Sequence, residues 1–145
     1  MDPSFRNARA SDLGAIREAL GAAGLPTQGV GGAGEFFICE ADGAFRGAAG
    51  VEVYGNDALL RSLVVAPEAR RLGLGRRLCE QAVKRARDTG CRAVYLLTLD
   101  ATEYFARLGF EIVARDQAPA GIQSSGEFSS HCPDSAVLMR RRIEP

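Results

Sequence analysis

The 145-residue chain has no excess of charge, a single histidine and no C-x-x-C pair. Its 18 basic and 18 acidic residues cancel, which excludes a protein that binds nucleic acid by broad neutralisation of phosphates. One histidine and four scattered cysteines lack the spacing of a zinc site, so we predict no metal and reduced thiols. The adjacent His131 and Cys132 indicate nucleophilic catalysis only weakly, because the members of such a dyad meet in space rather than in sequence.

Long apolar runs are missing as well. No window reaches the roughly 18 apolar residues that a membrane-spanning helix needs, so we expect no membrane partner. The N-terminal stretch MDPSFRNARASD lacks the apolar core of a signal peptide. We therefore predict a soluble, cytoplasmic protein with one domain, residues 1–145, which is long enough to bury a core.

Hydrophobic patterns and turn residues predict a mixed α/β domain with a mainly antiparallel sheet flanked by helices. Turn signals at Asp42-Gly43 and Gly55-Asn56-Asp57 divide residues 36–65 into three antiparallel strands. Apolar residues at i, i+4 spacing predict a helix over 74–88. The other expected elements are strands at 4–8, 92–99, 111–115 and 135–143, helices at 11–23 and 102–108, and loops at 24–35 and 117–130.

The stretch RSLVVAPEARRLGLGRRLCEQAVKRA, residues 61–86, places two glycines among four arginines between a strand and a helix. Three phosphate-binding patterns compete for it. A P-loop needs a lysine followed by serine or threonine, and a dinucleotide fingerprint needs a third glycine where Leu78 stands. The third pattern is R-x-x-G-x-G, and its residues are Arg70, Arg71, Leu72, Gly73, Leu74 and Gly75.

The third pattern has a direct physical basis. The first N–H groups of a helix have no partner within it, and the helix dipole adds partial positive charge there. Glycines let the backbone approach a ligand closely, so the amides of residues 71–76 can bind a pyrophosphate. The alternative is an ordinary turn beside a solvated helix face. The succession of strand, Pro67, arginines, glycines and helix favours the phosphate site.

Two segments, LLRSLVVAPEARRLGLGRRL (59–78) and YLLTLDATEYFARLGF (95–110), resemble the GNAT family of N-acetyltransferases, which use acetyl-CoA. The resemblance implies the GNAT acyl-CoA N-acyltransferase fold. It also implies that the pantetheine arm pairs with one strand, while the neighbouring strand, ending at Thr98, splays away to admit it. The coenzyme-binding residues it implies are Leu63, Val64, Val65, Arg70, Arg71, Leu72, Gly73, Leu74, Gly75, Arg76, Thr98, Tyr104 and Arg107.

The catalytic groups follow the family less closely. Many members have a tyrosine where this chain has Phe105, and that tyrosine protonates the thiolate leaving group. Here either the neighbouring Tyr104 substitutes for it or the thiolate leaves unaided. A backbone N–H near Val65 is the candidate oxyanion donor. Glu52, in an otherwise apolar strand, is a candidate base or amine binder, and the alternative is a solvent-facing residue.

Two arginines are candidates for binding a carboxylate of the acceptor, because a guanidinium matches a carboxylate in a bidentate manner. They are Arg61, with its neighbour Ser62, and Arg115. The alternative for Arg61 is an outward-facing charge or a structural ion pair. The segments GVEVYGNDALLRSL (50–63) and EFSSHCPDSAVLM (127–139) resemble an arsenic-resistance branch, some of whose members acetylate arsinothricin, a glutamate-like arsenical amino acid.

We therefore predict an N-acetyltransferase that moves acetyl from acetyl-CoA to the amine of a small molecule, a glutamate-like amino acid or an arsenical. The alternatives are acetylation of protein N-termini or lysines, and a non-catalytic sensor that binds CoA. The expected partners are small molecules, and a homodimer is left open.

Overall fold

The computed structural model describes residues 2–31, 34–128 and 135–144. The strands are β1 (Ser4–Asn7), β2 (Glu35–Ala41), β3 (Ala44–Tyr54), β4 (Asp57–Val65), β5 (Ala93–Thr98), β6 (Glu111–Ile112) and β7 (Val137–Arg142). The helices are α1 (Leu13–Ala22), α2 (Leu74–Asp88), α3 (Thr102–Arg107) and α4 (Ala120–Gln123). Short 3-10 turns lie at Ala10–Asp12, Pro67–Ala69 and Arg115–Gln117.

The seven strands form one sheet in the order β1-β2-β3-β4-β5-β7-β6. All neighbouring strands are antiparallel except β4 and β5, which are parallel. The predicted hairpin between β2 and β3 turns at Asp42 and Gly43, whose φ values of 54° and 74° are those of a two-residue type I′ turn. The predicted mixed α/β fold with a mainly antiparallel sheet is confirmed.

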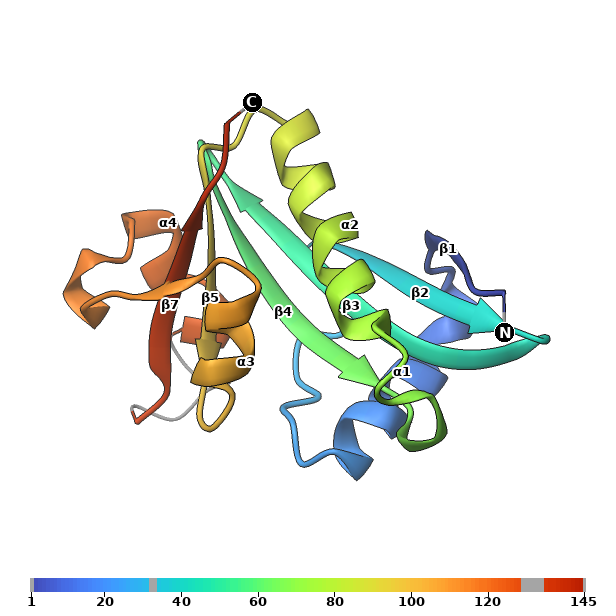
Figure 1. Cartoon of the computed structure of the whole chain (residues 1–145). Coiled ribbons are helices and arrows are strands. Elements are labelled where there is room, and N and C mark those ends of the chain that lie inside the picture. The colour runs from blue at the N-terminus through green and yellow to red at the C-terminus, as the bar shows by residue number, and fades with distance from the viewer. Residues whose placement is uncertain (1, 32–33, 129–134, 145) are drawn as a thin grey trace.

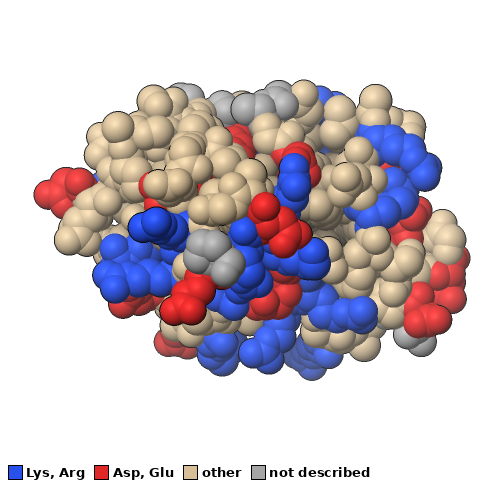
Figure 2. Space-filling view, turned by 90° about the horizontal axis from the view of Figure 1, so that it is seen from above, with Lys and Arg blue, Asp and Glu red and all other residues tan. Residues whose placement is uncertain are grey.

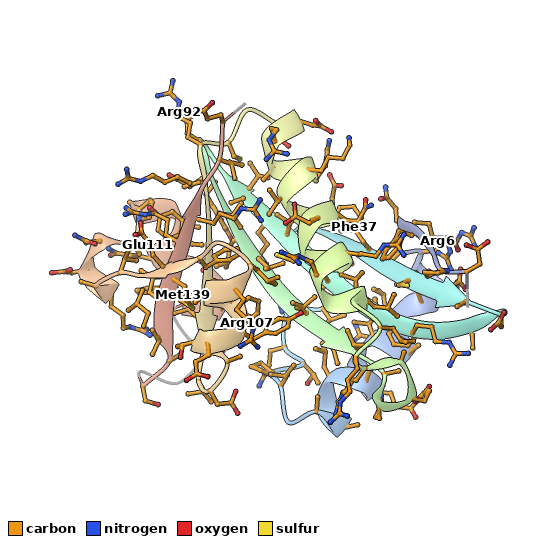
Figure 3. All side chains as sticks on the ribbon, viewed as in Figure 1. Arg6, Phe37, Arg92, Arg107, Glu111 and Met139 are labelled. Atoms are coloured by element: carbon orange, nitrogen blue, oxygen red, sulfur yellow. The ribbon has the colours of Figure 1, made fainter. Side chains whose placement is uncertain are left out.

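Helices cover both faces of the sheet (Figure 1). On one face α2 buries its predicted apolar stripe, Leu74, Leu78, Ala82 and Ala86, in the largest core cluster. That cluster extends from Phe37 on β2 to Met139 on β7 (Figure 3). On the other face, Ile16 and Leu20 of α1 pack on Phe36 and Ile38. The fold therefore has three layers, with the sheet between α2 on one face and α1 on the other.

The segment between β6 and β7 differs from the prediction. Residues 117–130 were expected to form a loop, but the described part includes α4, whose Ile122 is fully buried against Leu59 and Leu138. The predicted strand 111–115 is also too long, since β6 ends at Ile112 and Arg115 begins a 3-10 turn. A four-residue helix with one large apolar residue has no hydrophobic periodicity, so the sequence pattern could not predict α4.

The thiols Cys39, Cys79 and Cys91 are buried and form no disulfide. Burial raises the pKa of Cys79 to about 12, so this thiol is a core residue and not a nucleophile. His131 and Cys132 lie outside the described residues. Within the described ranges, no three His, Cys, Asp or Glu side chains are grouped so as to hold a metal ion.

Charges of both signs lie side by side mainly in the lower half of the face seen in Figure 2, where Lys and Arg predominate. Surface ion pairs with distances of 2.7 Å join Arg85 to Glu35 and Arg141 to Glu80. Among the described helices, none has both the length and the apolar character to cross a membrane.

Candidate active site

The parallel strands β4 and β5 separate along their length. They pair at Asp57↔Ala93, Ala58↔Val94 and Leu59↔Tyr95, and the ladder ends there. Beyond that point β5 continues to pair with β7 as far as Thr98, while β4 stays with β3. The predicted splay is therefore confirmed, and the two strands diverge as Figure 1 shows. A cleft of about 860 Å³ lies between the two strands. It is lined by residues 60–65 of β4, by residues 96–98 at the end of β5 and by residues 99–101, which follow β5.

A β-bulge marks the β4 wall of this cleft. The register changes from Ala48↔Val64 to Gly50↔Arg61, so β4 has one extra residue at this point. Ser62 adopts the left-handed conformation there, with φ of 56°. A bulge disrupts the ladder locally and redirects backbone groups. Ser62 and Leu63 line the cleft, so this bulge forms part of its wall.

One end of the cleft is formed by the glycine turn that begins α2. Gly73 has φ of 75° and ψ of 12°, and α2 starts at the next residue, Leu74. The N–H of Arg77 is bonded back to the Gly73 carbonyl at 3.2 Å, so the preceding N–H groups lie before the intrahelical ladder. Arg70, Arg71 and Arg76 also line this end. Backbone donors, helix dipole and guanidinium groups are the features that bind a pyrophosphate in proteins, so the phosphate site stays our prediction for this turn.

Tyr104 on α3 contributes a hydroxyl to the cleft beside this turn. A Cβ at Gly75 would overlap the Tyr104 hydroxyl, so the glycine permits the close approach. Burial is the main cause that raises the pKa of Tyr104, which keeps the phenol protonated at neutral pH. Phe105 also lines the cleft and packs edge-on against Tyr104, with ring centroids 5.2 Å apart. Arg107, labelled in Figure 3, completes this wall.

A tyrosine that only assists the leaving group is not indispensable, and we expect Tyr104→Phe to retain at least about a tenth of kcat. A full general acid would contribute about 10²–10⁴-fold. The measurement is steady-state turnover together with acetyl-CoA affinity. A thousandfold loss of kcat with unchanged coenzyme binding would show that Tyr104 is the acid.

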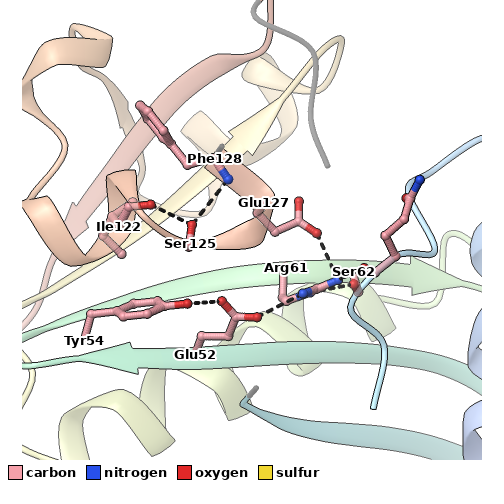
Figure 4. A network of polar contacts seen from close by, with 9 residues as sticks. Glu52, Tyr54, Arg61, Ser62, Ile122, Ser125, Glu127 and Phe128 are labelled. Carbon is pink, nitrogen blue, oxygen red and sulfur yellow. Dashed lines mark hydrogen bonds and ion pairs between the residues drawn. The ribbon is translucent and has the colours of Figure 1, made fainter. Parts of the chain in front are cut away.

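At the other end of the cleft, the guanidinium of Arg61 joins four segments (Figure 4). Its Nη1 donates to Glu52 Oε2 at 2.9 Å, and Nη2 donates to the Gln28 carbonyl at 2.6 Å. Nη2 also lies 3.0 Å from Glu127 Oε1, and Nε donates to Ser62 Oγ at 3.1 Å. The Arg61 side chain is only 2% exposed. It is therefore a buried ion-pair centre that also lines the cleft.

Glu52 lies behind Arg61 rather than in the cleft wall. It is 4% exposed, and it is not among the cleft-lining residues. Its Oε1 accepts a hydrogen bond of 2.5 Å from the Tyr54 hydroxyl, and burial together with this bond raises the pKa of Tyr54. The solvent-facing alternative is wrong, because Glu52 is buried. Its carboxylate holds Arg61 through an ion pair, and the role of base or amine binder stays a prediction.

Arg115 does not stand at a strand end beside the cleft. Its Nη1 donates to the Ala136 carbonyl at 2.8 Å, and its guanidinium lies 4.5 Å from the centroid of the Phe128 ring. It is not among the residues that line the cleft. Arg115 therefore holds the backbone at Ala136, which lines the cleft, and packs on the ring of Phe128.

The structure adds Glu127, which sequence reasoning missed. Its carboxylate comes from the segment after α4, lines the cleft and pairs with Arg61. The pairing joins residues 66 positions apart in the chain, so no local pattern announces it. The only indication of Glu127 in the sequence was an acidic residue within a segment predicted to be a loop.

The Acetyltransferase (GNAT) family model matches residues 14–110 of the chain. The chain belongs to the GNAT family. An amino-acid acetyltransferase of Neisseria meningitidis serogroup B is 29% identical over 109 residues, which are 74% of this chain and 24% of that protein. An uncharacterized N-acetyltransferase of Chlorobaculum tepidum is 29% identical over 148 residues, which cover 91% of this chain and 88% of that one.

Solved structures share the GNAT fold. N-acetylglutamate synthase from Neisseria gonorrhoeae, complexed with coenzyme A and N-acetyl-glutamate, has a TM-score of 0.82 at 23% identity and covers 100% of this chain and 36% of that one. Rv2747 from Mycobacterium tuberculosis, in complex with CoA, has a TM-score of 0.78 at 22% identity, and the match covers 97% of this chain and 99% of that one. The chain spans about a quarter of the curated amino-acid acetyltransferases and about a third of the synthase. Family and fold support an acetyl-CoA-dependent N-acetyltransferase.

Proposed function

We propose that this GNAT chain transfers acetyl from acetyl-CoA to the amine of a small amino acid, with a glutamate-like acceptor preferred. The observation that carries the proposal is the continuous cleft from the start of α2, through the gap between β4 and β5, to the ion pair of Arg61 with Glu127. One end has the donors for a pyrophosphate. The other end is small, buried and charged, which suits a polar acceptor of a few atoms.

We assign the parts of acetyl-CoA and the reaction steps to successive positions along the cleft. The pyrophosphate binds at the turn around Gly73, and the pantetheine arm runs along the unpaired edge of β4. The thioester carbonyl then lies beside the bulge at Ser62 and Leu63, whose backbone donors stabilise the oxyanion. The acceptor nitrogen attacks the carbonyl carbon, the C–S bond breaks, CoA leaves as a thiol or thiolate, and the amine proton passes to solvent. Tyr104 is our candidate proton donor for the sulfur, and the alternative is that the thiolate leaves unaided.

The acceptor class is supported by the charged end and by the relatives. The Neisseria relatives are amino-acid acetyltransferases, and the gonococcal structure holds N-acetyl-glutamate. Arg61 and Ser62 are our candidates for the acceptor carboxylate, since both line the cleft. An arsenical amino acid of similar shape, such as arsinothricin, is a narrower form of the same proposal. It is supported by the resemblance of residues 50–63 to the arsenic-resistance branch.

Acetylation of a protein N-terminus or lysine is the rival, and it needs an open groove for a peptide. Here Arg61 holds Gln28 on one side and Glu127 on the other. These contacts join the segments on the two sides of the acceptor end, which favours a small molecule. A non-catalytic CoA-binding sensor is consistent with Phe105 in place of the family's tyrosine.

A thiol-release assay with acetyl-CoA tests the proposal. We expect L-glutamate or arsinothricin to give at least about a 10-fold higher kcat/KM than n-butylamine, because a paired carboxylate adds about 1.5–3 kcal/mol. Peptides with free N-termini serve as the rival acceptors. Turnover of peptides without turnover of amino acids would favour the rival, and CoA binding without any turnover would favour the sensor.

A further inference from the structure

The guanidinium of Arg61 is held by a carboxylate that is itself held from its other side. Glu52 accepts from Arg61 Nη1 with Oε2 at 2.9 Å, and it accepts from the Tyr54 hydroxyl with Oε1 at 2.5 Å. Figure 4 shows the three side chains in a row, from Tyr54 through Glu52 to Arg61. Because each oxygen of Glu52 has its own donor, Tyr54 fixes the orientation of this carboxylate as much as Arg61 does.

The sheet places these three residues on one face. Glu52 and Tyr54 are two positions apart on β3, so their side chains point to the same side of the sheet. The register pairs Gly50 with Arg61, and Glu52 is two residues further along β3. Glu52 and Arg61 are therefore diagonal neighbours on adjacent strands, which is close enough for long side chains to meet.

Tyr54 is anchored outside the cleft and is not among the residues that line it. Its ring packs against the cluster that contains Leu59 and Ile122. A Cβ on Gly121 of α4 would lie 2.7 Å from Tyr54 Cβ, so the glycine allows α4 to rest directly on this side chain. Burial, together with the bond to Glu52, raises the pKa of Tyr54, so its hydroxyl stays a donor at neutral pH.

We propose that Tyr54 is a positioning residue for the acceptor: its hydroxyl, acting through Glu52, holds Arg61 in the orientation that meets the acceptor carboxylate. The proposal rests on the function proposed above, which takes Arg61 as a contact of that carboxylate. A guanidinium recognises a carboxylate through the fixed directions of its N–H groups, so this contact depends on how the guanidinium is held. An acceptor without a carboxylate does not depend on it.

A role of Tyr54 in packing alone leads to a different expectation. The ring supplies the packing, so removal of the hydroxyl would then leave all acceptors unaffected or, through a looser fold, weaken all acceptors alike. A positioning role instead affects the acceptors that carry a carboxylate. Comparing L-glutamate with n-butylamine therefore separates the two roles.

The experiment uses Tyr54→Phe, which keeps the ring and removes only the hydroxyl. We expect the KM of L-glutamate to rise about 5- to 20-fold, because Glu52 loses a hydrogen bond that helps to fix Arg61. The kcat with L-glutamate should stay within about threefold of the wild-type value, since Tyr54 does not line the cleft. The kcat/KM of n-butylamine and the affinity for acetyl-CoA, measured by calorimetry, should change less than about twofold.

The Arg61 side chain can also be followed without turnover. Its Nε–H donates to Ser62 Oγ at 3.1 Å, and the side chain is 2% exposed, so this N–H should exchange slowly with water. Its NMR signal is assigned by its loss in Arg61→Lys. In Tyr54→Phe we expect the N–H to exchange at least about fivefold faster, because the guanidinium is held less firmly.

Tyr95→Phe is the matched control, because Tyr95 is buried in the same cluster and its side chain is hydrogen-bonded to Arg140, which does not line the cleft. It should leave the acceptor constants and the exchange of the Arg61 N–H unchanged. An unchanged KM of L-glutamate in Tyr54→Phe, an equal loss for n-butylamine, or an unchanged exchange rate would overturn the proposal. If the wild type does not prefer L-glutamate to n-butylamine, the function proposed above fails, and the exchange rate still decides whether Tyr54 holds Arg61.

Discussion

Replacing Arg61 with alanine is expected to lower the free energy of unfolding by about 3–5 kcal/mol, the cost of leaving buried charges without their partner. The variant removes the contacts to Glu52 at 2.9 Å and Glu127 at 3.0 Å, both inside the protein. It also releases the Gln28 carbonyl and the Ser62 hydroxyl. The measurement is urea unfolding followed by circular dichroism, with the midpoint and the slope fitted separately.

Arg85→Ala is the control, since Arg85 binds Glu35 at 2.7 Å with both side chains about half exposed. An exposed pair contributes about 0–1 kcal/mol, so this variant should stay within about 1 kcal/mol of the wild type. A triple variant, Arg61→Met with Glu52→Gln and Glu127→Gln, removes all three charges and should recover stability relative to Arg61→Ala. Equal losses in the Arg61 and Arg85 single variants would contradict the buried-centre assignment.

The coenzyme half of the site could be predicted from the sequence because local rules determine it. A strand, a glycine turn and a helix follow one another within 61–86, and each obeys a short-range preference. The two-residue turns that separate β2, β3 and β4 are also local. Even the divergence of β4 and β5 was implied by resemblance to a family with the same order of elements.

The acceptor half could not be predicted in the same way. Arg61 was singled out, but its partners Gln28, Glu52 and Glu127 lie 33, 9 and 66 positions away in the chain. No spacing rule connects Arg61 with Gln28 or Glu127, which lie in segments outside the sheet, whereas Glu52 lies on the neighbouring strand β3. The four-residue helix α4 is held by the burial of Ile122, which is a tertiary effect. Arg115 shows the converse, since its residue type suited a carboxylate but its side chain packs on Phe128 and does not itself line the cleft.

Replacing Gly73 with aspartate is expected to weaken acetyl-CoA binding by at least about 30-fold, or about 2 kcal/mol. Gly73 has φ of 75° and lies in the turn where the N-terminal amides of α2 face the cleft. A carboxylate there repels the pyrophosphate at close range, in a partly desolvated site. The measurement is isothermal titration calorimetry of acetyl-CoA at low and at high salt, because repulsion between partly exposed charges falls with ionic strength.

Gly73→Asn separates charge from strain. Asparagine has the size of aspartate and tolerates the left-handed conformation better than most residues, and a Cβ at position 73 meets no atom within 4 Å. We expect Gly73→Asn to bind acetyl-CoA at least about 10-fold more tightly than Gly73→Asp. Gly55→Asp, at φ of 65° in the turn between β3 and β4 with no neighbour within 4 Å, shows the effect of the same substitution away from the cleft. If Gly73→Asp binds acetyl-CoA as well as Gly55→Asp does, then the pyrophosphate does not lie at the start of α2.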